Sequence, residues 1–130
     1  MAENGTIDAV VFDYGGVLTS AVRDTTTRWL AADDIDTDSF ATVMREWMAR
    51  DALDGSPVHR LETGALTGPE FEIEFAARLR TTGGGSVLAE GLLARMFAGM
   101  RPDPAMFELL GELRGLGLKV GVLSNRWANT

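Results

Sequence analysis

The chain has 130 residues, of which 45% are hydrophobic and 24% charged, and its formal net charge is -7. This length suits one ordinary globular domain, and no apolar run approaches the ~20 residues that a membrane-spanning helix needs. The acidic balance argues against a nucleic-acid surface, which needs clustered Lys and Arg. The absence of cysteine excludes disulfides and thiol chemistry. The first residues lack the basic and apolar regions of a signal peptide, so we expect a cytoplasmic protein without membrane partners.

The first expected element is a strand over residues 7–12, because this segment is apolar, rich in β-branched residues and followed by a glycine-containing turn. Such a composition is typical of a buried strand in a parallel sheet. Asp13 stands at its carboxyl end, before Tyr14, Gly15 and Gly16. A carboxylate in this place is costly unless it is solvated, paired or bound to a ligand.

Helices are expected along most of the middle of the chain. Apolar residues at three- and four-residue spacings and capping residues predict them over 23–32, 38–52, 67–80, 86–100 and 104–114. Thr67 and Glu70 have the spacing of a capping box, and Asp103 precedes Pro104 as an N-cap. Three consecutive glycines between 81 and 86 predict a flexible joint.

A second buried strand is expected over residues 118–123, followed by Ser124 and Asn125. A strand, a helix and a strand of matched apolar character predict a parallel α/β crossover. Residues 1–20 and 101–130 would then form an incomplete α/β core, and residues 21–100 an inserted helical domain. Ligands of open α/β sheets bind beyond the carboxyl ends of the strands, where Asp13 and Ser124 are expected.

These segments resemble the motifs of the haloacid dehalogenase (HAD) superfamily. Residues 12–18, Phe-Asp-Tyr-Gly-Gly-Val-Leu, resemble its first motif, and residues 118–125 resemble its second. Residues 61–64 and 70–71 resemble its helical C1 cap, near the N-terminal phosphatase-like domain of soluble epoxide hydrolases. The resemblance implies a Rossmann-like core with an inserted C1 cap.

The resemblance also implies an activity, namely Mg²⁺-dependent hydrolysis of a small phosphomonoester through an aspartyl-phosphate. Asp13 would be the nucleophile and a metal ligand, and the Gly15 carbonyl the second metal ligand. Ser124, Asn125 and the backbone of Gly16 would bind the phosphoryl group. A carboxylate can attack phosphorus to form a covalent intermediate, and Mg²⁺ offsets the charge repulsion.

Two departures from the HAD pattern weaken the inference of activity. Family phosphatases usually carry a second aspartate as general acid and base where this chain has Gly15, although some relatives also have glycine there. The third-motif lysine and the fourth-motif acidic pair are not found after the second strand. Lys119, the only lysine, is expected roughly 16 Å from Ser124 at ~3.3 Å per residue.

The chain therefore resembles the first part of a longer HAD protein. On its own we expect it to be inactive and to self-associate through an exposed sheet edge.

Other readings remain open. The enzyme could be a metal-independent haloacid dehalogenase, or the chain could be a non-catalytic binding module. Asp34, Asp36 and Asp38 begin like a calcium loop, but Ser39 and Arg45 stand where such a loop has Gly and Glu, which favours a helix-capping acidic surface.

We expect the single histidine and five aromatic side chains to have structural and not catalytic roles. His59 has no triad partners in the sequence, so it is expected on the surface of the helical domain. Five aromatic side chains are expected in the core: Trp47, Phe71, Phe75, Phe97 and Phe107.

Overall fold

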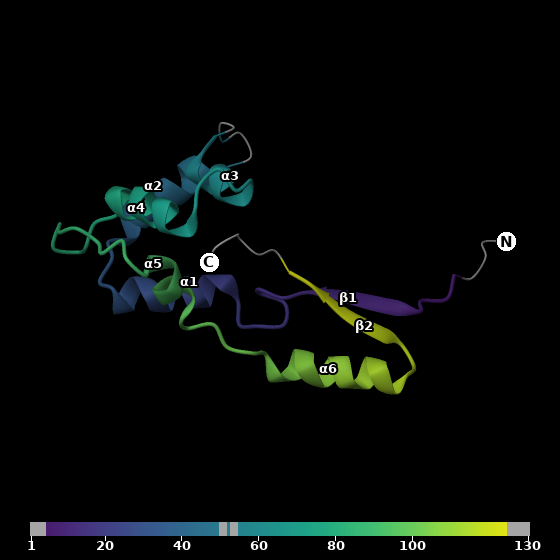
Figure 1. The fold of residues 1–130 in the computed structure, drawn as a ribbon. Helices are drawn as coiled ribbons and strands as arrows, with labels where there is room; N and C mark the ends of the chain where they lie inside the picture. The colour runs from purple at the N-terminus through teal and green to yellow at the C-terminus, as the bar shows by residue number, and fades with distance from the viewer. Residues whose placement is uncertain (1–4, 50–51, 53–54, 125–130) are drawn as a thin grey trace. The chain divides into compact units, whose positions relative to one another are not determined.

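The computed structural model describes residues 5–49, 52 and 55–124. This part of the chain is a mixed α/β structure of two strands and six helices (Figure 1). In chain order the elements are β1 (Ala9–Asp13), α1 (Val22–Ala32), α2 (Thr37–Met48), α3 (Pro57–Glu62), α4 (Gly68–Arg78), α5 (Leu92–Phe97), α6 (Pro104–Gly115) and β2 (Lys119–Leu123).

The described residues divide into two compact units. The first comprises residues 5–24 and 100–124 and contains β1, α6 and β2; the second comprises residues 25–99 and contains α2 to α5. α1 begins in the first unit and continues into the second. No described helix has the length and apolar character required to cross a membrane.

The sheet of the first unit is a parallel pair, as the two apolar segments predicted. Its register runs from Ala9 opposite Lys119 to Asp13 opposite Leu123. α6 precedes β2 and packs against it, which gives the strand–helix–strand crossover (Figure 1). The expected Rossmann-like core has more strands than the two that pair here.

The two strands are not buried, contrary to the sequence prediction. Val10, Phe12 and Val120 are half-buried, and Val120 lines a groove together with residues of α6. Alternate residues point to opposite faces of a sheet, so Val11 and Leu123 belong to the other face, where they are 65% and 73% exposed. Apolar strands of this kind need cover on both faces, and within the first unit α6 covers one.

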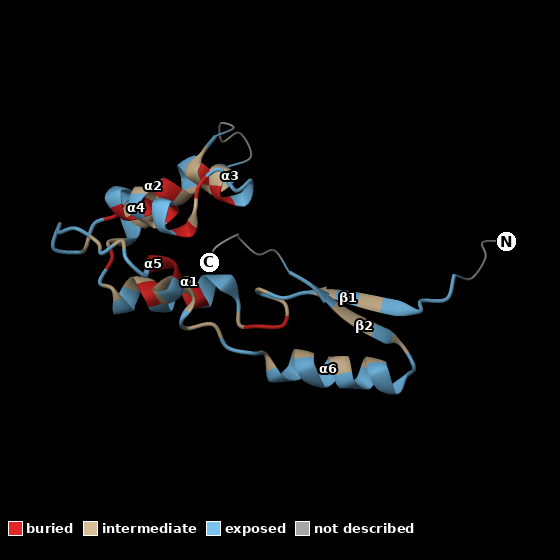
Figure 2. Ribbon diagram, viewed as in Figure 1, coloured by how far each residue is buried: buried red, intermediate tan, exposed pale blue. Residues whose placement is uncertain are grey.

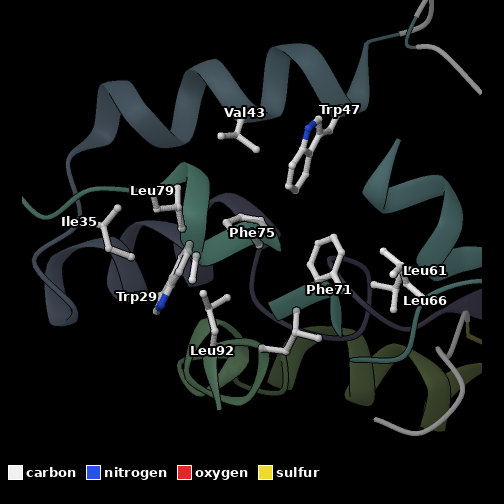
Figure 3. Close-up of a cluster of buried hydrophobic side chains, with 12 residues drawn as sticks. Trp29, Ile35, Val43, Trp47, Leu61, Leu66, Phe71, Phe75, Leu79 and Leu92 are labelled. Carbon is white, nitrogen blue, oxygen red and sulfur yellow. The ribbon is translucent and has the colours of Figure 1, made fainter. Parts of the chain in front are cut away.

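The second unit holds the hydrophobic core of the described chain. Figure 2 shows buried residues in the helices and connecting segments of this unit, and a further buried segment between β1 and α1. Phe75 of α4 is 2% exposed, and the rings of Trp29, Trp47 and Phe71 lie around it (Figure 3). The ring of Phe40 lies 6.3 Å from that of Phe75. The expectation that Trp47, Phe71 and Phe75 are core residues is confirmed.

The two other aromatic side chains expected in the core behave differently. Phe97 is partly buried against the core of the second unit. Phe107 is 44% exposed on α6, so its assignment to the core was wrong. α6 has no buried residue at all, because the two-stranded sheet offers it too little surface to bury an apolar face.

Side-chain caps begin four of the described helices, and at the start of α3 Ser56 Oγ accepts from the His59 amide. Thr67 Oγ1 accepts from the Glu70 amide and the Glu70 carboxylate accepts from the Thr67 amide, which confirms the predicted capping box of α4. Asp103 caps α6 as predicted. α2 begins one residue before the predicted start, because Asp36 accepts hydrogen bonds from the Asp38 and Ser39 amides.

The helix predicted over residues 86–100 is much shorter in the structure. α5 begins after Gly91, whose φ of 73° is left-handed and interrupts the helix. The carbonyls of Leu88 and Glu90 accept hydrogen bonds from the Arg95 guanidinium instead of from helical amides. Arg95 also donates to Asp33 at 2.7 Å, which ties α5 to the end of α1.

The triple-glycine segment, predicted as a flexible joint, forms a hydrogen-bonded turn in the structure. The Thr81 amide donates to the Gly85 carbonyl at 3.0 Å, and the Gly85 amide donates to Thr81 Oγ1 at 2.9 Å. An antiparallel bridge pairs Thr81 with Ile35. The glycines allow the backbone to turn sharply, and Gly84 takes a left-handed φ of 85°.

Candidate functional site

Asp13 is the last residue of β1, and its side chain is exposed to solvent. Its Oδ1 accepts a hydrogen bond from the Tyr14 amide at 2.7 Å. Among the described residues, nothing donates a hydrogen bond to Oδ2 and no cation forms an ion pair with the carboxylate. The carboxylate therefore has one oxygen fixed by the backbone and one available to a ligand.

The residues after Asp13 form a turn closed by its own hydrogen bonds. The amides of Val17 and Leu18 both donate to the Tyr14 carbonyl, at 3.2 and 2.9 Å. Gly16 has a φ of 79°, which favours glycine, and a Cβ there would lie 3.4 Å from Val22 Cγ2. At Gly15 a Cβ would meet nothing within 4 Å, so space does not require a glycine at this position.

Two of the predicted ligand groups belong to one peptide unit, the one that joins Gly15 to Gly16. The carbonyl of Gly15 and the amide of Gly16 point in opposite directions, because a trans peptide is planar. The Gly16 amide donates to Thr19 Oγ1 at 2.9 Å. A phosphoryl group could bind this amide only after that bond breaks. Among the described residues, nothing donates a hydrogen bond to the Gly15 carbonyl.

Sequence reasoning did not identify Thr19. It is 3% exposed, and its hydroxyl donates to the Ser20 carbonyl at 3.0 Å while accepting from Gly16. The signal available in the sequence was a polar residue directly after the apolar pair Val17-Leu18, which follows the glycines. Whether that residue would face solvent or the turn depended on the path of the backbone.

Ser124 follows β2 at the same edge of the sheet as Asp13. Leu123 is the register partner of Asp13, and Ser124 is the next residue and exposed. The carboxyl ends of two hydrogen-bonded parallel strands thus carry the predicted nucleophile and the predicted phosphate-binding hydroxyl. Asn125, the other predicted phosphate ligand, lies outside the described residues.

The donor types beside Asp13, a carboxylate and a backbone carbonyl, are ones that Mg²⁺ accepts. Mg²⁺ commonly takes one or two carboxylates, keeps several waters and is completed by substrate phosphate. The Asp13 carboxylate and the Gly15 carbonyl would supply two oxygen donors. The described residues contain no group of three or more His, Cys, Asp or Glu side chains suited to a metal, so no closed protein cage exists there.

Lys119 is far from Asp13 along the sheet. It begins β2 opposite Ala9, four residues before the partner of Asp13, which corresponds to roughly 13 Å at ~3.3 Å per residue. It therefore does not supply a cation beside Asp13, in agreement with the sequence reading.

The remaining candidates behave as structural or surface residues. Asp34 Oδ1 accepts from the Thr82 hydroxyl at 2.8 Å and Asp36 caps α2, which supports the capping interpretation over a calcium loop. His59 is exposed on α3. Neither group lies in the first unit with Asp13.

Comparison of the chain with models of protein families and with curated proteins gives no match.

Proposed function

We propose that the chain carries the nucleophile of a HAD-like hydrolase that removes phosphate from a small phosphomonoester in the cytoplasm. The observation that carries this proposal is the register of the sheet, which sets Asp13 opposite Leu123 at the carboxyl edge, directly before Ser124. The described strands would belong to a Rossmann-like core, and residues 21–100 to a C1 cap.

Asp13 would act by nucleophilic attack. An oxygen of its carboxylate forms a bond to phosphorus while the bond from phosphorus to the alcohol oxygen breaks, and water then hydrolyses the aspartyl-phosphate. Oδ2, which accepts no hydrogen bond from a described residue, suits this attack, and Oδ1 keeps a lone pair for the metal beside its hydrogen bond from the Tyr14 amide. Gly15 has no side chain that could protonate the leaving group. General acid catalysis of this kind typically raises the rate about 10²–10⁴-fold. A substrate with a good leaving group is therefore favoured.

Asp13 and the Gly15 carbonyl would hold Mg²⁺, which neutralises charge on the phosphoryl group when bound. Ser124 would orient the group from the neighbouring strand. The described residues place no Lys or Arg in contact with Asp13, and the missing cation would cost several kcal/mol at a phosphoryl-transfer site. We therefore expect residues 1–130 alone to bind Mg²⁺ and phosphate but not to turn over substrate.

The test is an amide NMR titration of the chain with Mg²⁺ and then with inorganic phosphate. Saturable shifts at residues 13–16 are expected, and Asp13→Asn should abolish them. Asparagine keeps an oxygen that can accept from the Tyr14 amide, so the turn should survive the change. Asp8, which precedes β1 and is exposed, provides a matched control as Asp8→Asn.

An assay of an aryl phosphate and of a 2-haloacid, each with and without Mg²⁺, separates the alternatives. Mg²⁺-dependent phosphate release that Asp13→Asn removes would establish the phosphatase and disprove the expected inactivity. Halide release without metal would establish a dehalogenase. A chain whose Asp13 region binds neither Mg²⁺ nor phosphate would disprove the hydrolase proposal.

A non-catalytic binding module is the second candidate. The observation that favours it is the absence, among the described residues, of a cation paired with Asp13 and of an acid at Gly15. In that case Asp13 would serve as a turn residue, as its hydrogen bond to the Tyr14 amide permits. The NMR titration distinguishes the two, because a turn residue has no reason to bind the metal.

A further inference from the structure

Burial in the first unit is concentrated at two consecutive residues. Within the described residues 5–24 and 100–124, Leu18 and Thr19 are the only buried ones, with exposures of 0% and 3%. The strands and α6 around them are half-buried or exposed. A buried threonine hydroxyl in such a setting must be satisfied by hydrogen bonds, and its partners show what it holds in place.

The Thr19 hydroxyl uses both its acceptor and its proton on the backbone. It accepts from the Gly16 amide at 2.9 Å and donates to the Ser20 carbonyl at 3.0 Å. The first of these bonds fixes the peptide unit between Gly15 and Gly16. Since that unit is planar and trans, holding its amide toward Thr19 aims the Gly15 carbonyl away from Thr19.

The backbone at Thr19 is itself anchored. An antiparallel bridge pairs Thr19 with Pro102, and the Asp103 amide donates to the Leu18 carbonyl at 2.8 Å. The Ser20 amide donates to the Arg101 carbonyl at 2.7 Å. These bonds tie the segment after the glycine turn to the segment that begins α6, so Thr19 occupies a fixed position from which its hydroxyl can hold Gly16.

We propose that Thr19 is a positioning residue for the metal site, acting through the Gly15–Gly16 peptide. Its hydroxyl holds the Gly16 amide and thereby keeps the Gly15 carbonyl oriented as a ligand for a divalent cation bound by Asp13. The Gly16 amide is consequently a structural donor and not a phosphate ligand. This inference rests on the proposed function, since it assumes that Asp13 and Gly15 bind Mg²⁺.

The hydrogen bond is tested first, without metal and without a variant. Amide hydrogen exchange of the wild-type chain should be slower at Gly16 than at Gly15, whose amide has no hydrogen-bond partner among the described residues. In Thr19→Val, which preserves the shape of the side chain, exchange at Gly16 should rise about tenfold or more. Thr19→Ser, which keeps the hydroxyl, should retain the protection. Equal exchange at Gly15 and Gly16 in the wild-type chain would overturn the proposal.

The second measurement is the Mg²⁺ affinity from the NMR titration. Loss of a group that orients a metal ligand typically costs 10–100-fold in affinity, so Thr19→Val should bind Mg²⁺ about tenfold more weakly and Thr19→Ser close to wild type. Unchanged amide shifts in β2 would show that Thr19→Val folds.

Equal affinity of the wild-type chain and Thr19→Val overturns the positioning role while leaving the proposed function intact. A wild-type chain that binds no Mg²⁺ at Asp13 overturns both. If Thr19→Val does not fold, two other measurements test the positioning role. Weak Mg²⁺ binding by Thr19→Ser would contradict it, because this variant keeps the hydroxyl. Equal amide exchange at Gly15 and Gly16 in the wild-type chain would contradict it as well.

Discussion

Replacing Phe75 should remove the central side chain of the helical unit. Its ring centroid lies 5.4 Å from that of Phe71, 5.6 Å from Trp47 and 6.0 Å from Trp29, and the residue is 2% exposed. Truncating a buried phenylalanine to alanine typically costs about 3–5 kcal/mol, through lost transfer free energy and the cavity that remains. Because a domain of this size is stable by only about 5–15 kcal/mol, Phe75→Ala should lose a large part of its folding free energy.

Phe75→Leu is the milder variant. It keeps most of the volume but loses the ring contacts, each worth about 0.5–1.5 kcal/mol, so an overall loss of about 1–2 kcal/mol is expected. Ile73→Ala is the matched control, because Ile73 lies on the same helix and is 63% exposed. Its change should stay within about 0.5 kcal/mol.

Urea unfolding followed by far-ultraviolet circular dichroism and tryptophan fluorescence measures all three free energies. Trp29 and Trp47 both contact Phe75, so their fluorescence reports directly on this core. A loss below about 1 kcal/mol for Phe75→Ala would refute the packing argument. An equal loss for Ile73→Ala would refute it as well, since an exposed side chain on the same helix would then matter as much as the buried ring.

Two further predictions follow from the helix caps and the sheet. Thr67→Ala should lower the free energy of unfolding in urea by about 1 kcal/mol, because it removes the acceptor for the Glu70 amide. Thr67→Ser keeps the hydroxyl and should be nearly neutral. An equal loss in both variants would contradict the capping role. Val11→Lys should weaken self-association of residues 1–130, because Val11 and Leu123 are exposed on one sheet face and a lysine there adds charge to it. Light scattering measures the association state. A wild-type chain that stays monomeric at all concentrations would contradict this expectation.

Local chemistry in the sequence was enough to predict several elements. The apolar β-branched segments before Asp13 and before Ser124 predicted the two strands and their parallel pairing, which the structure confirms. The capping box at Thr67 and the Asp103-Pro104 pair predicted the starts of α4 and α6, because cap residues satisfy backbone amides within the same turn. The short α3 was not predicted separately, since a six-residue helix shows little periodicity.

Other features depended on side-chain hydrogen bonds to the backbone or on a contact between residues far apart in the chain. The first turns of the predicted helix 86–100 are absent, because Arg95 binds the carbonyls of Leu88 and Glu90 from the side and Gly91 takes a left-handed conformation. The glycines after Thr81 form a hydrogen-bonded turn next to the bridge that pairs Thr81 with Ile35. Neither the donor nor the bridging partner can be recognised from the local pattern.

At the candidate site, the sequence by itself determined which polar groups follow the two strands. Asp13 after an apolar strand and Ser124 after another predicted two polar groups at one sheet edge, and the register brings those strand ends together. The tertiary structure alone decided the direction of the Gly15–Gly16 peptide, because the buried Thr19 hydroxyl takes the Gly16 amide. It also decided the exposure of the strands: apolar composition favours burial, but a strand is buried only where other elements pack over both of its faces.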